Sequence, residues 1–140
     1  ESLEKMNELR IGVVGSEENF DEAEAQEMIL EAFDKLDLQC PTKTKIIVSG
    51  LTDRGIKAIA YREATKRNWG TMGIACSRAR EYDCFPVDEK IIEGNEWGDE
   101  SSTFLDNIEV LIRIGGGNQS FRETAEAKAR GKQVMEGDLS

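Results

Sequence analysis

Residues 109–117 are Glu-Val-Leu-Ile-Arg-Ile-Gly-Gly-Gly, a short apolar run that ends in three consecutive glycines. A run of this length and β-branched character is typical of a buried strand. Glycine has no Cβ, so the chain can turn sharply and approach a ligand closely where the strand ends. Residues 120–130, closed by Gly131, are predicted to form a helix directly after the turn. The segment therefore predicts a strand, a tight turn and a helix in that order.

The same order recurs on both sides of this segment. Asp21 is a predicted N-cap, and apolar residues then follow at i, i+3, i+4 spacing as far as Leu36, which indicates an amphipathic helix. Ile91 and Ile92 fit either a short strand or a packed turn. Further strands are predicted at residues 9–16, 45–50, 72–76 and 132–135, further helices at 55–68 and 101–107, and a frayed tail at 136–140.

Short apolar strands that alternate with helical crossovers indicate a parallel sheet covered on both faces. The predicted fold class is therefore α/β, with a doubly wound, mostly parallel Rossmann-like sheet and helices on both faces. The chain has 140 residues, which is enough for one domain, so residues 1–140 are predicted to form a single nucleotide-binding domain. In such a sheet the ends of all parallel strands lie along one edge, where ligands bind.

The composition excludes several function classes. A net charge of −10 argues against a nucleic-acid partner, because such binding requires clustered Lys and Arg. No apolar stretch reaches the roughly 18 residues of a membrane span, so no membrane partner is expected. The three cysteines form no CxxC pair and no secretory signal is visible, which favours a cytoplasmic location. The chain has no histidine, so no metal site and no histidine-based triad are predicted, and no cofactor is expected.

The glycine-rich turn is the strongest candidate site. The first N–H groups of a helix have no partner within the helix, and the helix dipole favours an anion beside them. Phosphate binding is therefore predicted for Gly115, Gly116, Gly117, Asn118, Gln119 and Ser120. The alternative is a turn that binds no ligand, with Ser120 and Glu123 forming an S-x-x-E capping box.

Two further turns at predicted strand ends contain glycine. Gly15 and Ser16 follow the first strand, and Ser16 either donates to a phosphate or caps the turn. Ser49 and Gly50 follow the second strand, and Arg54 either pairs with a phosphate or lies in solvent. Because all these turns are expected at one edge of the sheet, they are predicted to form one site.

The order of these turns resembles that of the SLOG superfamily, which includes the LOG cytokinin-activating phosphoribohydrolases, once described as lysine decarboxylases, and DprA-like proteins. The LOG signature is P-G-G-x-G-T-x-x-E. Gly116, Gly117 and Glu123 match it, Ser120 stands in place of threonine, and Gln119 departs from glycine. The resemblance implies that Glu123 is a catalytic acid that assists cleavage of an N-glycosidic bond. Residues 98–104 contain no basic residue where the family's enzymes carry an Arg-Lys pair, which favours binding over catalysis.

Three residues before the short helix complete the candidate site. Trp97 is placed to stack on a base, and Asp99 or Glu100 to accept ribose hydroxyls; the alternative is a surface loop with Trp97 covering the edge of the core. Three functions follow: a sensor-type domain that binds a nucleotide or its derivative, an N-glycosidic-bond hydrolase or transferase, or a degenerate domain used in protein contact. The resemblance also implies a homo-oligomer.

Overall fold

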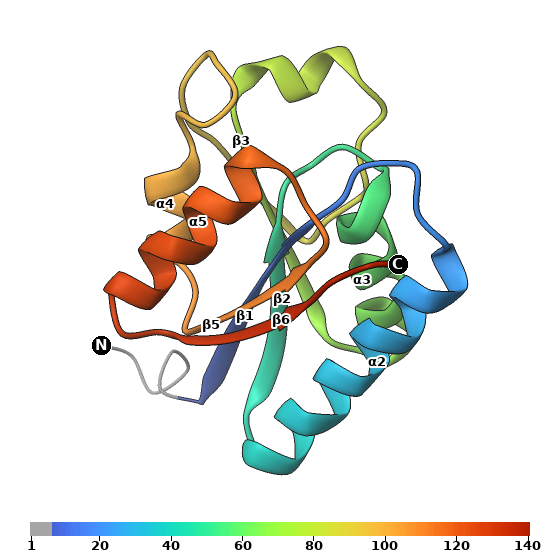
Figure 1. The fold of residues 1–140 in the computed structure, drawn as a ribbon. Helices are drawn as coiled ribbons and strands as arrows, with labels where there is room; N and C mark the ends of the chain where they lie inside the picture. Colours follow the sequence, from blue (N-terminus) through green and yellow to red (C-terminus); the bar gives the residue numbers. More distant parts are fainter. Residues whose placement is uncertain (1–6) are drawn as a thin grey trace.

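A computed structural model describes residues 7–140, so the first six residues of the predicted domain lie outside the described part. It shows a six-stranded sheet of parallel strands in the order β4-β3-β2-β1-β5-β6 (Figure 1). The elements are β1 Glu8–Gly15, α2 Glu22–Gln39, β2 Thr44–Ser49, α3 Gly55–Lys66, β3 Gly70–Ala75, a 3-10 helix at Ser77–Glu81, β4 Glu89–Ile92, α4 Ser101–Asp106, β5 Val110–Ile114, α5 Asn118–Ala129 and β6 Gln133–Gly137.

The two faces of the sheet carry separate helix layers, α2 and α3 on one and α4 and α5 on the other (Figure 1). The larger core includes Phe33 of α2 and Tyr61 of α3, both fully buried. The second core includes Phe104 of α4 and Ala127 of α5. The predicted α/β, doubly wound sheet with helices on both faces is therefore confirmed. None of the helices within residues 7–140 combines the length and the apolar composition that crossing a bilayer requires.

Helix α2 shows how local sequence sets an element. The Asp21 carboxylate accepts hydrogen bonds from the backbone N–H groups of Ala23 (2.9 Å) and Glu24 (3.3 Å), so it satisfies two donors that the helix cannot. The predicted N-cap is confirmed. Residues 25, 29, 32, 33 and 36 form the buried face, which follows the predicted helical spacing.

The neighbouring strands β1 and β5 define the place where a ligand can enter. Both strands end at the same level, because Gly15 pairs with Ile114 in the register of the sheet. The chain leaves β1 toward α2 on one face and leaves β5 toward α5 on the other (Figure 1). Connections that diverge in this way leave a crevice outside the strand ends.

Three local predictions need comment. Ile91 and Ile92 belong to a strand, β4, rather than a packed turn. The capping box is wrong, because α5 begins at Asn118 and its N-cap, Gly117, has no side chain, so Ser120 already lies inside the helix. The frayed tail is also wrong. Residues 136–137 belong to β6, and Ser140 hydrogen-bonds the carboxylate of Glu24.

Candidate functional site

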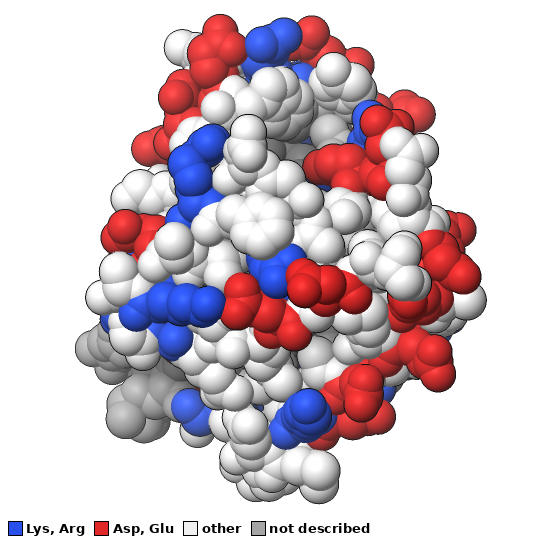
Figure 2. Space-filling model, in the orientation of Figure 1, with Lys and Arg blue, Asp and Glu red and all other residues white. Residues whose placement is uncertain are grey.

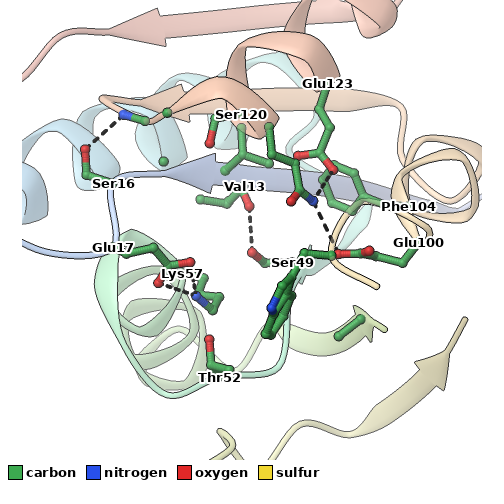
Figure 3. Close-up of a pocket in the computed structure, with 18 of the residues that line it drawn as sticks. Val13, Ser16, Glu17, Ser49, Thr52, Lys57, Glu100, Phe104, Ser120 and Glu123 are labelled. Carbon is green, nitrogen blue, oxygen red and sulfur yellow. Dashed lines mark hydrogen bonds and ion pairs between the residues drawn. The ribbon is translucent and has the colours of Figure 1, made fainter. Parts of the chain in front are cut away.

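A cavity of about 510 Å³ lies at the carboxyl ends of β1, β2 and β3, between the first turns of α3 and α5 (Figure 3). This volume is in the range of sites that hold small molecules. The predicted residues that line it are Gly15, Ser16, Ser49, Gly50, Trp97, Glu100, Gly116, Gly117, Asn118, Gln119, Ser120 and Glu123. The structure therefore brings residues from all three predicted turns to one cavity.

Three predicted residues do not line this cavity, each for a physical reason. Arg54 has a half-exposed side chain that pairs with two glutamates of the β1–α2 loop. Gly115 belongs to the sheet edge, where its N–H donates to the carbonyl of Gly137 at 2.8 Å. Asp99 accepts hydrogen bonds from two N–H groups of its own loop, at 3.0 Å each. These residues shape the surroundings of the cavity.

The backbone amides at the start of α5 are the main polar feature of the cavity. Gly116 donates its N–H to the Ser16 hydroxyl at 2.9 Å, so this amide is occupied by the protein. Within residues 7–140, the N–H groups of residues 117–120 donate no hydrogen bond to a protein acceptor. The first intrahelical bond, from Phe121 to the carbonyl of Gly117, comes after them. Four adjacent donors therefore remain free at the positive end of the helix dipole.

Ser16 has a positioning role. Its side chain ties the end of β1 to the glycine-rich turn, a hundred residues away in the sequence. Gly116 has a φ of +119°, and a Cβ there would lie 2.7 Å from the Cβ of Ser120. Glycine is therefore required at this position both by the backbone conformation and by the packing.

Beside the backbone amides of residues 117–120, the cavity is lined by the carboxylates of Glu100 and Glu123 (Figure 3) and by the side-chain amide of Gln119. Gln119 Nε2 lies 3.3 Å from Oε2 of Glu100 and 3.3 Å from Oε2 of Glu123. The Ser101 hydroxyl donates to the same Glu123 oxygen at 2.7 Å, and the N–H of Gly98 donates to Glu100 at 2.8 Å. These contacts hold both carboxylates in fixed orientations.

Burial raises the pKa of Glu123, and the hydrogen bonds from Ser101 and Gln119 act in the opposite direction. The nearby charge of Glu100 adds to the increase. A buried carboxyl group with a raised pKa is the type of group that serves as a general acid. Among residues 7–140, no three His, Cys, Asp or Glu side chains are grouped so that they could hold a metal ion.

The raised pKa of Glu123 predicts how stability changes with pH. A carboxyl group whose pKa is raised on folding stabilises the fold while it is protonated, and this contribution is lost as the pH rises through its folded-state pKa. We expect Glu123→Gln, which can accept the same two hydrogen bonds, to raise the melting temperature at pH 7. The gain should shrink as the pH falls toward 4.5, the ordinary value for glutamate.

Thermal melts of both proteins between pH 4 and pH 8 measure this effect. Glu27→Gln removes a charge from an exposed position on α2 and serves as the control. If the gain in melting temperature for Glu123→Gln does not depend on pH, or equals that of the control, the raised pKa of Glu123 is contradicted.

Lys57 and Glu17 are cavity residues that the sequence interpretation missed. Lys57 lies in the first turn of α3, and its Nζ is 2.8 Å from each carboxylate oxygen of Glu17. A signal was present for Lys57, because it follows the glycine turn at Gly55 by two residues, at the same edge of the sheet. No such signal marked Glu17, whose place depends on a tertiary contact.

No protein-family model matches the chain, and no curated protein matches it. Several solved structures do. The chain is similar to the molybdenum cofactor binding protein from the phototrophic bacterium Rippkaea orientalis, with a TM-score of 0.76 and 22% identity over 95% of this chain and 78% of that one.

The molybdenum cofactor carrier protein from Chlamydomonas reinhardtii gives a TM-score of 0.68 and 20% identity over 92% of this chain and 76% of that one. The structural-genomics target TM1055 gives a TM-score of 0.70 and 21% identity over 90% of this chain and 72% of that one. At these identities the likeness shows a shared fold. That fold is the Rossmann-like α/β sheet predicted from the sequence.

Proposed function

We propose that this chain is a binding domain for a phosphate-bearing, nucleotide-like small molecule, which it holds in the cavity between the carboxyl ends of β1, β2 and β3 and the start of α5. The observation that carries the proposal is that, within residues 7–140, the N–H groups of residues 117–120 have no protein acceptor, and these four residues line a cavity of about 510 Å³. Backbone amides at a helix N-terminus bind phosphate without a side-chain charge. An acidic protein can therefore bind an anion there.

The charges around the cavity set the orientation of the ligand. Among residues 7–140, four glutamates line the cavity and Lys57 is the one basic residue of the lining. A phosphate group is repelled by Glu100 and Glu123, so it lies at the amides. The carboxylates of Glu100 and Glu123 accept hydrogen bonds from the hydroxyl or amino groups at the other end of the ligand. A nucleotide has both of these ends.

Trp97 provides a surface for a planar ring. It lines the cavity, its side chain is half-exposed, and its ring lies beside that of Tyr82 with 6.1 Å between centroids. Stacking of a base on an aromatic side chain contributes about 1–3 kcal/mol. Figure 2 shows acidic and basic side chains mixed over the face of the molecule, without a continuous basic stripe of the kind that binds nucleic acid. This distribution supports a small ligand rather than a polymer.

The neighbours of the same fold add support, since two of them are molybdenum cofactor carrier or binding proteins and so bind a small molecule. A thermal-shift panel tests the proposal directly. We expect AMP, ADP-ribose, NAD or a deoxynucleotide to stabilise the protein, by about 2.7 kcal/mol at one hundred times its dissociation constant. For a domain of this size that is a rise of roughly 8–10 °C in melting temperature.

Adenosine, which lacks the phosphate, is the matched control and should give no more than a small shift. If adenosine stabilises the protein as much as AMP, the phosphate is not what the site binds. If no compound in the panel gives a shift, the proposal fails and a role in protein contact becomes the better explanation.

A second candidate function, an N-glycosidic-bond hydrolase, is favoured by one observation. Glu123 lines the cavity with a raised pKa and lies next to a second carboxylate, that of Glu100. A carboxylate in this position can stabilise an oxocarbenium-like transition state. The test is release of free base from nucleoside monophosphates. Release by the wild type that Glu123→Gln abolishes would support hydrolysis, and stabilisation by AMP without release would leave binding as the function.

A further inference from the structure

Lys57 is a buried cation in a cavity whose other charged lining residues, in the described part of the chain, are glutamates. Its side chain is only 10% exposed, and the aliphatic part packs over Gly50. Burial lowers the pKa of Lys57, while Glu17 acts to raise it. A buried ammonium group requires an anionic partner, because an unpaired charge removed from water strongly destabilises the fold. Within the described structure that partner is Glu17.

Glu17 is held much less firmly than Lys57. Its side chain is 53% exposed, and it belongs to the loop between β1 and α2 rather than to a helix or strand. Its carboxylate also lies 3.6 Å from Nε of Arg54, outside the cavity lining. If Glu17 moves away from Lys57, it keeps a cationic partner in solvent. Exposed ion pairs contribute little to stability, so Glu17 loses little when it exchanges one cationic partner for the other.

Thr52 supplies a second donor beside Lys57. It lines the same cavity, its residue is 7% exposed, and no hydrogen bond joins its hydroxyl to another of residues 7–140. Figure 3 shows Glu17, Lys57 and Thr52 on one wall of the cavity and Ser120 and Glu123 on the facing wall. The cavity therefore has two groups of anion-binding donors, the amides at the start of α5 and the Lys57–Thr52 pair.

We propose that Lys57 and Thr52 form a second anion subsite, in which the Glu17 carboxylate takes the place of a ligand's second phosphoryl group. The inference rests on the proposed function, and it names the ligand class as a nucleoside diphosphate or its derivative. One phosphoryl group binds the amides of residues 117–120, and the other displaces Glu17 from Lys57.

Calorimetric titration with AMP and ADP tests the subsite. Wild type should bind ADP about tenfold or more tightly than AMP, since a hydrogen bond to a charged group contributes that much. Lys57→Gln should remove the preference for ADP by weakening the binding of ADP and not that of AMP. Lys57→Arg should keep the preference. Glu17→Gln removes the competing carboxylate and should increase the ratio of ADP to AMP affinity severalfold. The urea midpoint of each variant shows that it is folded.

The outcomes separate this subsite from the proposed function. If AMP and ADP bind wild type equally, or if Lys57→Gln weakens both to the same extent, the subsite is refuted while nucleotide binding stands. If neither ligand binds wild type, the subsite is refuted, and the proposed function fails as well if no other compound of the thermal-shift panel stabilises the protein. Should Lys57→Gln not fold, Glu17→Gln decides, because an unchanged affinity ratio would overturn the subsite.

Discussion

Replacing Gly15 with alanine is expected to lower the free energy of unfolding by about 3 kcal/mol. A Cβ at this position would overlap the carbonyl oxygen of Ile114 and lie 2.8 Å from Cγ1 of Ile56. That carbonyl accepts the N–H of Ser16 at 3.1 Å, so β5 cannot move away without loss of a hydrogen bond. The end of β1 therefore has no room for a methyl group. Urea denaturation measures the loss.

Gly117→Ala is the matched control for this prediction. Gly117 has an extended backbone with a φ of −127°, and no atom lies within 4 Å of a Cβ built there. We expect its free energy of unfolding to stay within about 0.5 kcal/mol of the wild type, as for most surface substitutions. Equal losses for the two variants would show that the close approach of β1 and β5 at Gly15 is not the cause.

The second large effect is expected from Asn118→Pro, which removes one free N–H from the phosphate site. We expect affinity for AMP to fall tenfold or more, because a hydrogen bond to a charged group contributes about 1.5–3 kcal/mol. Asn118 is the first residue of α5, where proline is well tolerated because this N–H has no partner in the helix. The stability of the fold should therefore change little. Calorimetry measures the affinity and urea denaturation the stability.

Asn118→Ala separates the backbone from the side chain. It keeps the N–H and removes the amide side chain, so AMP affinity should stay within about twofold of the wild type, well under the effect of a lost charged hydrogen bond. If Asn118→Ala weakens AMP binding as much as Asn118→Pro does, the side chain rather than the backbone binds the phosphate. The proposed role of the free amides is then incorrect.

The fold was predictable because its strands and helices have strong local signals. The apolar run before Gly115 and the helical spacing from Ala25 to Leu36 each lie within one element, so composition and period identify them. The alternation of strands and helices along the chain then implies a parallel sheet with helices on both faces. The start of α5 was less predictable, because an S-x-x-E pattern at a helix end can also lie inside the first turn, as Ser120 and Glu123 do.

The cavity was predictable only in part. Because the strands are parallel, their carboxyl ends lie along one edge of the sheet. This places Gly15, Ser49 and Gly116 at that edge, and all three line the cavity. Sequence spacing does not show which polar groups then meet. The bond from Gly116 to Ser16 and the pair of Lys57 with Glu17 join residues that are far apart along the chain. Arg54 was predicted for the site, but its half-exposed side chain is paired with glutamates outside the lining.

We expect the N–H groups of residues 117–120 to bind the phosphate of the ligand. Two-dimensional ¹H–¹⁵N NMR during a titration with AMP observes these amides directly. We expect the amide protons of residues 117–120 to shift downfield in a saturable way, and adenosine to leave them in place. If AMP binds and these four resonances do not move while others do, the ligand lies elsewhere and these amides do not bind its phosphate.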